Sequence, residues 1–204
     1  GRTHLGYLGG ENGFSAAASR STRQCPAAAA AAARPATARS PATPAASLLG
    51  VCDSAGAVRH YRGNIFASNG TAGENRTVND VEIESYVRGV IPRESPASWA
   101  DRGNGTGINA LKAQAVAARS YGLAQGGGIT NRRYSYAKTC DTTNCQVYGG
   151  AGTRTSAMAN IVAIEDWRSD RAVSETALMI RVRAATPLVP VSTEFSSSNG
   201  DRTA

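Results

Sequence analysis

The sequence predicts a single mixed α+β domain, with short strands and a few helices around a groove, preceded by a low-complexity tail. Two observations predict this class. Segments with apolar residues spaced three and four apart, which is typical of helices, lie among short strand-like segments. These segments do not follow the regular alternation of strand and helix found in βαβ folds. A chain of 204 residues, of which 41% are hydrophobic, is long enough for one such domain with its own core.

The low-complexity part lies at the start of the chain. Residues 26–47 are almost wholly Ala, Pro, Ser, Thr and Arg, and they contain four prolines and no apolar stripe. This composition favours a linker with partial polyproline II character. We therefore expect residues 1–50 to be a poorly ordered tail or linker rich in Gly, Ala, Pro and Arg, and residues 51–204 to form the domain.

The composition argues against a nucleic-acid-binding face and against a membrane span. The formal net charge is +7, but +4 of it lies within residues 1–50, so the predicted domain is only mildly basic. No cluster of Lys and Arg with interleaved aromatic residues marks a nucleic-acid-binding face. No apolar run approaches the roughly 18 residues that a membrane span requires.

Three segments of the predicted domain have a readable pattern. Residues 57–70 resemble a strand that ends in an Asn-Gly turn. Residues 77–92 begin with alternating apolar positions and then change to the helical spacing of Ile83, Tyr86, Val87 and Val90, and we expect Pro92 to end that element. A further helix is expected near residues 154–165.

The clearest helix is expected over residues 108–125, between a Gly-rich loop and three glycines. Its predicted buried stripe consists of Ile108, Leu111, Ala115, Ala118 and Gly122, and its many alanines indicate close packing against another element. Gln114 and Arg119 fall elsewhere on the helix, where they could reach a groove.

Glu94 lies between two prolines in the stretch VRGVIPRESPASW, residues 87–99. Each proline fixes its own φ and restricts the residue before it. The carboxylate is therefore either a solvated surface group in a turn or a group held rigidly for proton transfer.

The four cysteines are Cys25, Cys52, Cys140 and Cys145. An even number permits disulfides in an oxidising compartment, with three possible pairings. The close pair in CDTTNCQ, residues 140–146, could alternatively supply two ligands to a metal ion.

Four segments, taken in order, resemble the SpoIID/LytB family, which is named after stage II sporulation protein D and the amidase enhancer. They are VNDVEIESYVRGVIPRESPASW, ALKAQAVAARSYGLAQ, CDTTNCQVYGG and STEFSSSNG, at residues 78–99, 110–125, 140–150 and 192–200. The resemblance does not reach residues 1–50. Since the chain ends soon after the last segment, where relatives usually continue, we expect the domain to be truncated or altered at its C-terminal end.

The resemblance implies a secreted or cell-wall-associated bacterial protein related to sporulation. Active family members are lytic transglycosylases, which cut the MurNAc–GlcNAc bond of peptide-stripped peptidoglycan strands and leave 1,6-anhydro-MurNAc ends. Their single catalytic glutamate corresponds to Glu94. One acid is enough because the 6-hydroxyl of the sugar is the nucleophile, whereas ordinary glycosidases need two carboxylates.

The resemblance also implies a substrate-binding set and an alternative function. The set contains Gln114, Arg119, Asp141, Gln146, Tyr148, Ser196, Ser197, Ser198 and Asn199. For Arg119, a structural salt bridge is the other interpretation.

Some relatives bind zinc near the CDTTNCQ segment, often with a histidine at the position that is Asn144 here. We therefore expect no cofactor, and zinc bound by Cys140 and Cys145 is the alternative. The alternative function is a non-catalytic wall-binding protein that activates an N-acetylmuramoyl-L-alanine amidase.

Overall fold

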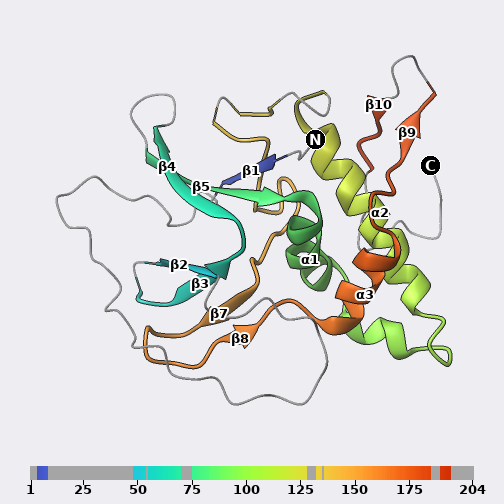
Figure 1. Ribbon diagram of the computed structural model, residues 1–204, viewed down its shortest axis with the longest axis horizontal. Helices are drawn as coiled ribbons and strands as arrows, with labels where there is room; N and C mark the ends of the chain where they lie inside the picture. The colour runs from blue at the N-terminus through green and yellow to red at the C-terminus, as the bar shows by residue number, and fades with distance from the viewer. Residues whose placement is uncertain are drawn as a thin grey trace.

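The computed structural model describes residues 4–8, 48–53, 55–69, 75–127, 132–134, 136–184 and 189–193. Within these ranges it contains three α-helices and several short strands in small sheets, which confirms the α+β class. Strands β2 to β5, β7 and β8 lie on one side of α1 and helices α2 and α3 on the other, where the pair β9 and β10 lies beside α2 (Figure 1).

The strands form three sheets. The first has the order β4-β5-β1-β6, the second β2-β3-β7-β8, and the third pairs β10 with β9. Most neighbours are antiparallel, and β1 with β6 is a parallel pair. The strands are β1 (His4–Leu8), β2 (Leu49–Cys52), β3 (Val58–Tyr61), β4 (Asn64–Asn69), β5 (Asn75–Glu82), β6 (Thr139–Cys140), β7 (Gly152–Arg154), β8 (Val162–Ala163), β9 (Val182–Arg183) and β10 (Val189–Pro190).

The helices pack together beside these sheets. They are α1 (Ile83–Glu94), α2 (Ile108–Ala124) and α3 (Trp167–Glu175), with two 3-10 turns, η3 (Ala97–Asp101) and η4 (Gln125–Gly127). Helix α1 touches both α2 and α3 and continues directly from β5. In the described part of the chain, no helix combines the length and apolarity that crossing a bilayer requires.

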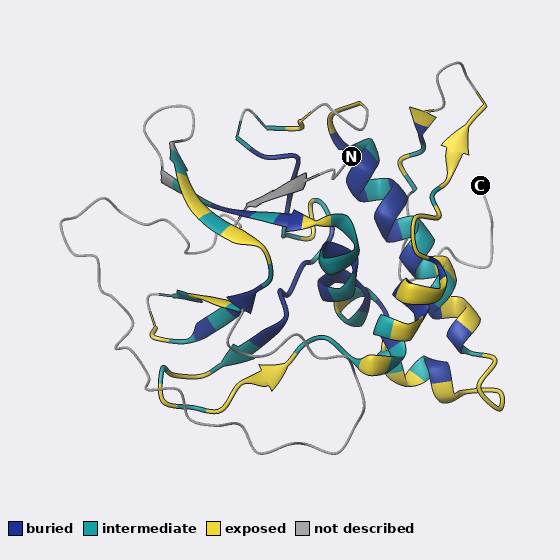
Figure 2. Ribbon diagram, in the orientation of Figure 1, coloured by how far each residue is buried: buried dark blue, intermediate teal, exposed yellow. Residues whose placement is uncertain are grey.

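The main core lies around α1 and the inner face of α2 (Figure 2). The predicted stripe of α2, from Ile108 to Gly122, is buried as expected. The change from strand to helix at Ile83 is also confirmed. Side chains of α1 fill the centre of this core, because Tyr86, Val87 and Val90 are all fully buried.

Two sequence predictions about element boundaries are wrong. Helix α1 does not end at Pro92 but continues through it to Glu94. A proline near the C-terminal end removes only one intrahelical donor, and its fixed φ is compatible with the helix. Residues 154–165 form strand and turn structure instead of a helix, and α3 begins later, at Trp167, where the Asp166 side chain accepts a hydrogen bond from the Arg168 N–H.

Strand β1 belongs to the segment that the sequence predicts to be a tail. Its residues pair with β5 along the whole of β1, from His4 opposite Glu82 to Leu8 opposite Val78. It also lies beside β6, with Tyr7 opposite Thr139. This part of residues 1–50 thus completes the first sheet, while the boundary near residue 50 stays a prediction.

Gly89, in the middle of α1, allows another segment to approach the helix closely. A Cβ at this position would lie 2.4 Å from Cε2 of Tyr148 and 2.9 Å from the carbonyl oxygen of Gly150. Because Tyr148 is fully buried, its ring has no free space into which it could move. The absence of a side chain at Gly89 is therefore a packing requirement.

We predict that Gly89→Ala destabilises the fold, although alanine is the better helix former by about 1 kcal/mol. Overpacking should outweigh propensity and lower the free energy of unfolding by about 1–3 kcal/mol, as measured by urea denaturation. Ser85→Ala, on the same helix, is the control and should change stability little. A more stable Gly89→Ala variant would contradict the packing described above.

Candidate functional site

Glu94 is the last residue of α1, and its side chain is half-buried. The next residue, Ser95, adopts an extended conformation, which the following proline favours, and its N–H donates to the carbonyl oxygen of Ile91 at 2.8 Å. The helix that carries the carboxyl group is anchored in the core by its buried face. Glu94 is therefore held on a rigid element, as expected for a residue that must be positioned accurately.

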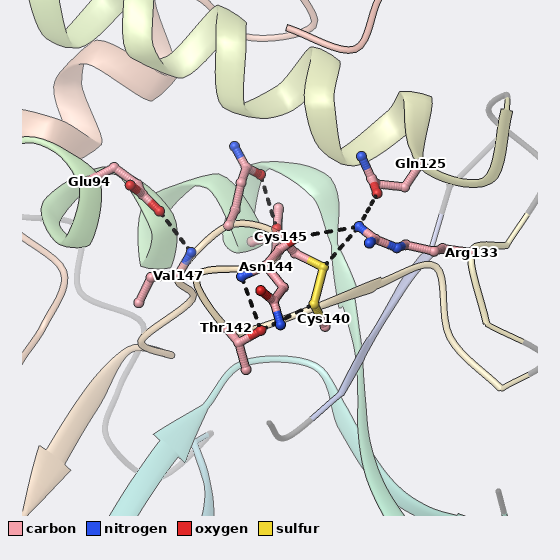
Figure 3. The surroundings of a disulfide bond; sticks show 10 residues. Glu94, Gln125, Arg133, Cys140, Thr142, Asn144, Cys145 and Val147 are labelled. Atoms are coloured by element: carbon pink, nitrogen blue, oxygen red, sulfur yellow. Dashed lines mark hydrogen bonds between the residues drawn. A yellow bond between two sulfur atoms is a disulfide. The ribbon is translucent and has the colours of Figure 1, made fainter. Parts of the chain in front are cut away.

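A backbone donor holds one oxygen of this carboxyl group. The N–H of Val147 donates to Oε1 of Glu94 at 2.8 Å (Figure 3). A hydrogen bond to a carboxylate is stronger than one between neutral groups. A main-chain N–H also has no side-chain rotamer, so its direction is set by the path of the chain around Val147.

Residues 146–150, here called the docked segment, follow α1 closely. Gln146 accepts a hydrogen bond from the hydroxyl of Tyr86, at 3.1 Å, and the N–H of Gly149 donates to the carbonyl oxygen of Gly89, at 3.0 Å. Gly149 leaves little room for a side chain, since a Cβ would lie 2.9 Å from Cγ2 of Ile164 and 3.1 Å from Cδ of Arg93. Together with the bond from Val147, these contacts attach the docked segment to α1 at three points.

Two buried tyrosines join the docked segment to the rest of the core. Tyr86 and Tyr148 have ring centroids 5.1 Å apart, and the Tyr148 hydroxyl donates to Oδ1 of Asn79 on β5, at 3.0 Å. Burial raises the pKa of both phenols, and for Tyr86 the charges of Tyr121 and Glu94 add to this effect. Both hydroxyls therefore stay protonated at ordinary pH and remain available as donors.

A disulfide lies immediately before the docked segment. Cys140 and Cys145 are bonded, with their Cα atoms 5.6 Å apart, and Cys52 is also disulfide-bonded. Nη1 of Arg133 lies 3.3 Å from Sγ of Cys145 and 3.4 Å from the carbonyl oxygen of Asn144 (Figure 3). The loop that closes at Cys145 is therefore fixed both covalently and by a cationic side chain.

The donor set at this loop does not fit zinc. The sulfurs of Cys140 and Cys145 are joined to each other, whereas zinc binds cysteine as the free thiolate. Within the described ranges, no three His, Cys, Asp or Glu side chains gather into a possible metal site. The sequence left open either a disulfide or a metal site at Cys140 and Cys145, and the structure contains the disulfide.

Arg119 lies in the core and not in a groove. Its side chain is 1% exposed and forms a bidentate ion pair with Glu84, at 2.9 and 2.7 Å, and Nη1 donates to the carbonyl oxygen of Met179 at 3.0 Å. The guanidinium thus connects α1, α2 and the chain after α3. The structure thus places Arg119 in a salt bridge, the other interpretation that the sequence allowed, and its contact with substrate stays a prediction.

Among the described residues, the other predicted binding side chains lie in different settings. Tyr148 is in the core, Gln146 is fully buried, and Oδ2 of Asp141 lies 3.6 Å from Nη1 of Arg59. Gln114 is half-buried on α2, and its Nε2 is buried and has no hydrogen-bond partner among the described residues. Ser196, Ser197, Ser198 and Asn199 lie outside the described residues.

Sequence reasoning missed the main-chain hydrogen bond from Val147 to Glu94. Val147 acts through its main chain, and no side-chain pattern in the sequence marks such a donor. Tyr86 was predicted only as an apolar position of a helix, yet its hydroxyl holds Gln146. The two consecutive glycines after Tyr148 were the available signal, because glycines often mark a close approach of one backbone to another element.

We predict that Arg119→Met lowers the free energy of unfolding by about 3–5 kcal/mol, because it leaves the Glu84 carboxylate partly buried without its partner. Chemical denaturation would measure the loss. Lys112→Met is a matched control on the same helix, since it removes a partly exposed cation paired with Glu175 and should have little effect. Unchanged stability with weaker glycan binding would instead favour the substrate-binding interpretation of Arg119.

The disulfide yields a separate stability prediction. Replacing both Cys140 and Cys145 by serine should lower the free energy of unfolding by about 2 kcal/mol, the chain-entropy value for a loop this short. The measurement is urea denaturation of the oxidised wild type and of the double variant. Equal midpoints and slopes for the two proteins would mean that the bond adds nothing to stability.

Comparisons with known proteins match the part of the chain that contains Glu94 and the docked segment. The family described as Stage II sporulation protein (SpoIID) matches residues 71–182, which include α1, the disulfide loop and the docked segment. An uncharacterized protein of Brachyspira hyodysenteriae is 40% identical over 73 residues, which are 36% of this chain and 17% of that protein. The amidase enhancer of Bacillus subtilis is 44% identical over 64 residues, which are 31% of this chain and 7% of that protein.

The chain thus spans less than a fifth of the length of either relative. No solved structure matches it. The family match, however, covers more than half of the chain and contains Glu94 together with the segment that holds it. This protein therefore belongs to the SpoIID family of stage II sporulation proteins.

Proposed function

We propose that this protein acts at the bacterial cell wall as a lytic transglycosylase, which cleaves the MurNAc–GlcNAc bond of peptide-stripped glycan strands. Membership of the SpoIID family supports the role at the wall. The observation that carries the finer proposal is the Glu94 carboxyl group, fixed at the end of a core helix by a main-chain donor. A single positioned carboxyl group is what an intramolecular transglycosylation needs.

The proposed reaction uses Glu94 twice. The protonated carboxyl first donates its proton to the glycosidic oxygen, and the bond between that oxygen and C1 of MurNAc breaks. The 6-hydroxyl oxygen of the same MurNAc then forms a bond to C1, and the Glu94 carboxylate accepts the hydroxyl proton. The products are a 1,6-anhydro-MurNAc end and a GlcNAc end with a free 4-hydroxyl, and the carboxyl group is protonated again.

The hydrogen bond from Val147 assigns different tasks to the two carboxyl oxygens. Oε1 accepts the N–H, so in the acid form it serves as the carbonyl oxygen. The transferable proton is then carried by Oε2, which has no hydrogen bond to the described residues. The same donor stabilises the carboxylate that forms when the proton leaves, which favours the first step.

A second function is favoured by one comparison. A relative that is 44% identical over 64 residues is named Amidase enhancer. A protein of that kind would bind the wall and stimulate an N-acetylmuramoyl-L-alanine amidase without cleaving glycan itself. In that case Glu94 would not be needed, whereas the transglycosylase depends on it.

The decisive experiment is digestion of peptide-stripped glycan strands by the wild type and by Glu94→Gln, with the products identified by mass. We expect anhydro-ended fragments from the wild type and a loss of activity on the order of 10²-fold or more in the variant. The matched control is Glu82→Gln, because Glu82 is an exposed carboxylate at the other end of α1 and should be dispensable.

A parallel assay tests the alternative. A purified amidase is given intact peptidoglycan with the wild type, with Glu94→Gln or with no added protein. If neither protein releases anhydro ends but both stimulate the amidase equally, the transglycosylase proposal fails and the enhancer function replaces it.

A further inference from the structure

We propose that Tyr86 and Gln146 are positioning residues, which hold the N–H of Val147 against Glu94. This inference rests on the proposed function of Glu94 as the acid. It also gives Gln146 a role different from the substrate contact expected from the sequence.

The connection begins with a buried hydrogen bond. The Tyr86 hydroxyl donates to Oε1 of Gln146, and neither side chain has any exposed surface. The next residue along the chain is Val147, whose N–H donates to Glu94. The peptide plane that carries this N–H begins at the carbonyl carbon of Gln146, so fixing Gln146 also fixes the direction of the donor.

Helix α1 supplies both ends of this connection. Tyr86 and Glu94 belong to the same helix, about two turns apart. The contact that holds the donor and the carboxyl group itself are therefore both fixed to one rigid element. Beyond Val147, the docked segment is attached again to α1, through the bond from Gly149 to Gly89. Val147 is thus held on both sides by contacts to the helix that bears the acid.

The side chain of Gln146 is incompletely satisfied, which argues against a purely structural role. Its Nε2 is buried and has no hydrogen-bond partner among the described residues. An apolar side chain would avoid this cost in a core of the same shape, so a retained buried amide calls for an explanation. Alignment of the following peptide group, through the bond to Tyr86, is such an explanation.

The test compares Tyr86→Phe with Thr176→Val. Both hydroxyls belong to buried residues and each donates a hydrogen bond, from Tyr86 to Oε1 of Gln146 and from Thr176 to the carbonyl oxygen of Ala172 at 2.8 Å. Only the Tyr86 bond acts on the peptide group that carries the Val147 N–H, because Gln146 supplies the carbonyl half of that group and Thr176 lies at the end of α3. The measurements are kcat and KM on peptide-stripped glycan strands, hydrogen exchange of the Val147 amide by NMR, and the free energy of unfolding.

For Tyr86→Phe we expect kcat to fall on the order of 10-fold, KM to stay near the wild-type value, and the Val147 amide to exchange faster. Thr176→Val also removes a buried hydrogen bond, so it should lose stability, but it should keep wild-type kcat and slow Val147 exchange. The double variant Tyr86→Phe/Gln146→Leu removes both hydrogen-bonding partners, so it should recover stability without recovering kcat.

Equal losses of kcat in Tyr86→Phe and Thr176→Val would overturn the inference, because general loosening of the core would then explain both. Recovery of kcat together with stability in the double variant would overturn it as well. If the wild type cleaves no glycan, the transglycosylase proposal has failed. The hydrogen-exchange rate of the Val147 amide then remains as the test of whether Tyr86 positions that amide. Unchanged exchange of that amide in Tyr86→Phe would then reject the positioning role.

Discussion

The arrangement of the site depends on the close approach of the docked segment to helix α1 at Gly89. Tyr148 occupies the space that a side chain at Gly89 would fill, and the Gly149 N–H bonds to the helix backbone at the same point. With the segment in this place, Val147 reaches Glu94 and Gln146 reaches Tyr86. A glycine with no chemistry of its own thus determines where the main-chain donor to Glu94 lies.

Buried polar contacts then define the geometry that packing makes possible. Arg119 connects α1 and α2 to the chain after α3 through Glu84 and the Met179 carbonyl oxygen, while Tyr148 connects the docked segment to β5 through Asn79. Breaking such contacts leaves a buried group unpaired, which is costly, so each contact favours one arrangement over others. Rigidity around Glu94 therefore arises from several separate elements and from no single one.

The sequence predicted the parts of this structure that follow from local pattern. The spacing of apolar residues identified the start of α1 and the buried stripe of α2, while the role of Glu94, which the family motifs singled out, stays a proposal. It could not predict that α1 continues through Pro92, because a proline is compatible with a final helical turn as well as with a break. Nor could it show that Arg119 faces inward, since a cation on a small-residue helix has the same pattern whether it meets a glycan or a buried carboxylate. The donor at Val147 belongs to the main chain and has no residue signature.

The bond between Cys140 and Cys145 has a practical consequence for how the protein is prepared. Disulfides persist in oxidising compartments, whereas a reducing cytosol keeps thiols free. Recombinant material from such a cytosol would carry two thiols next to the docked segment, and thiolates are soft ligands that suit zinc. Export to an oxidising compartment, or oxidation with a check of the thiol content, is therefore needed before activity and metal content are compared between laboratories.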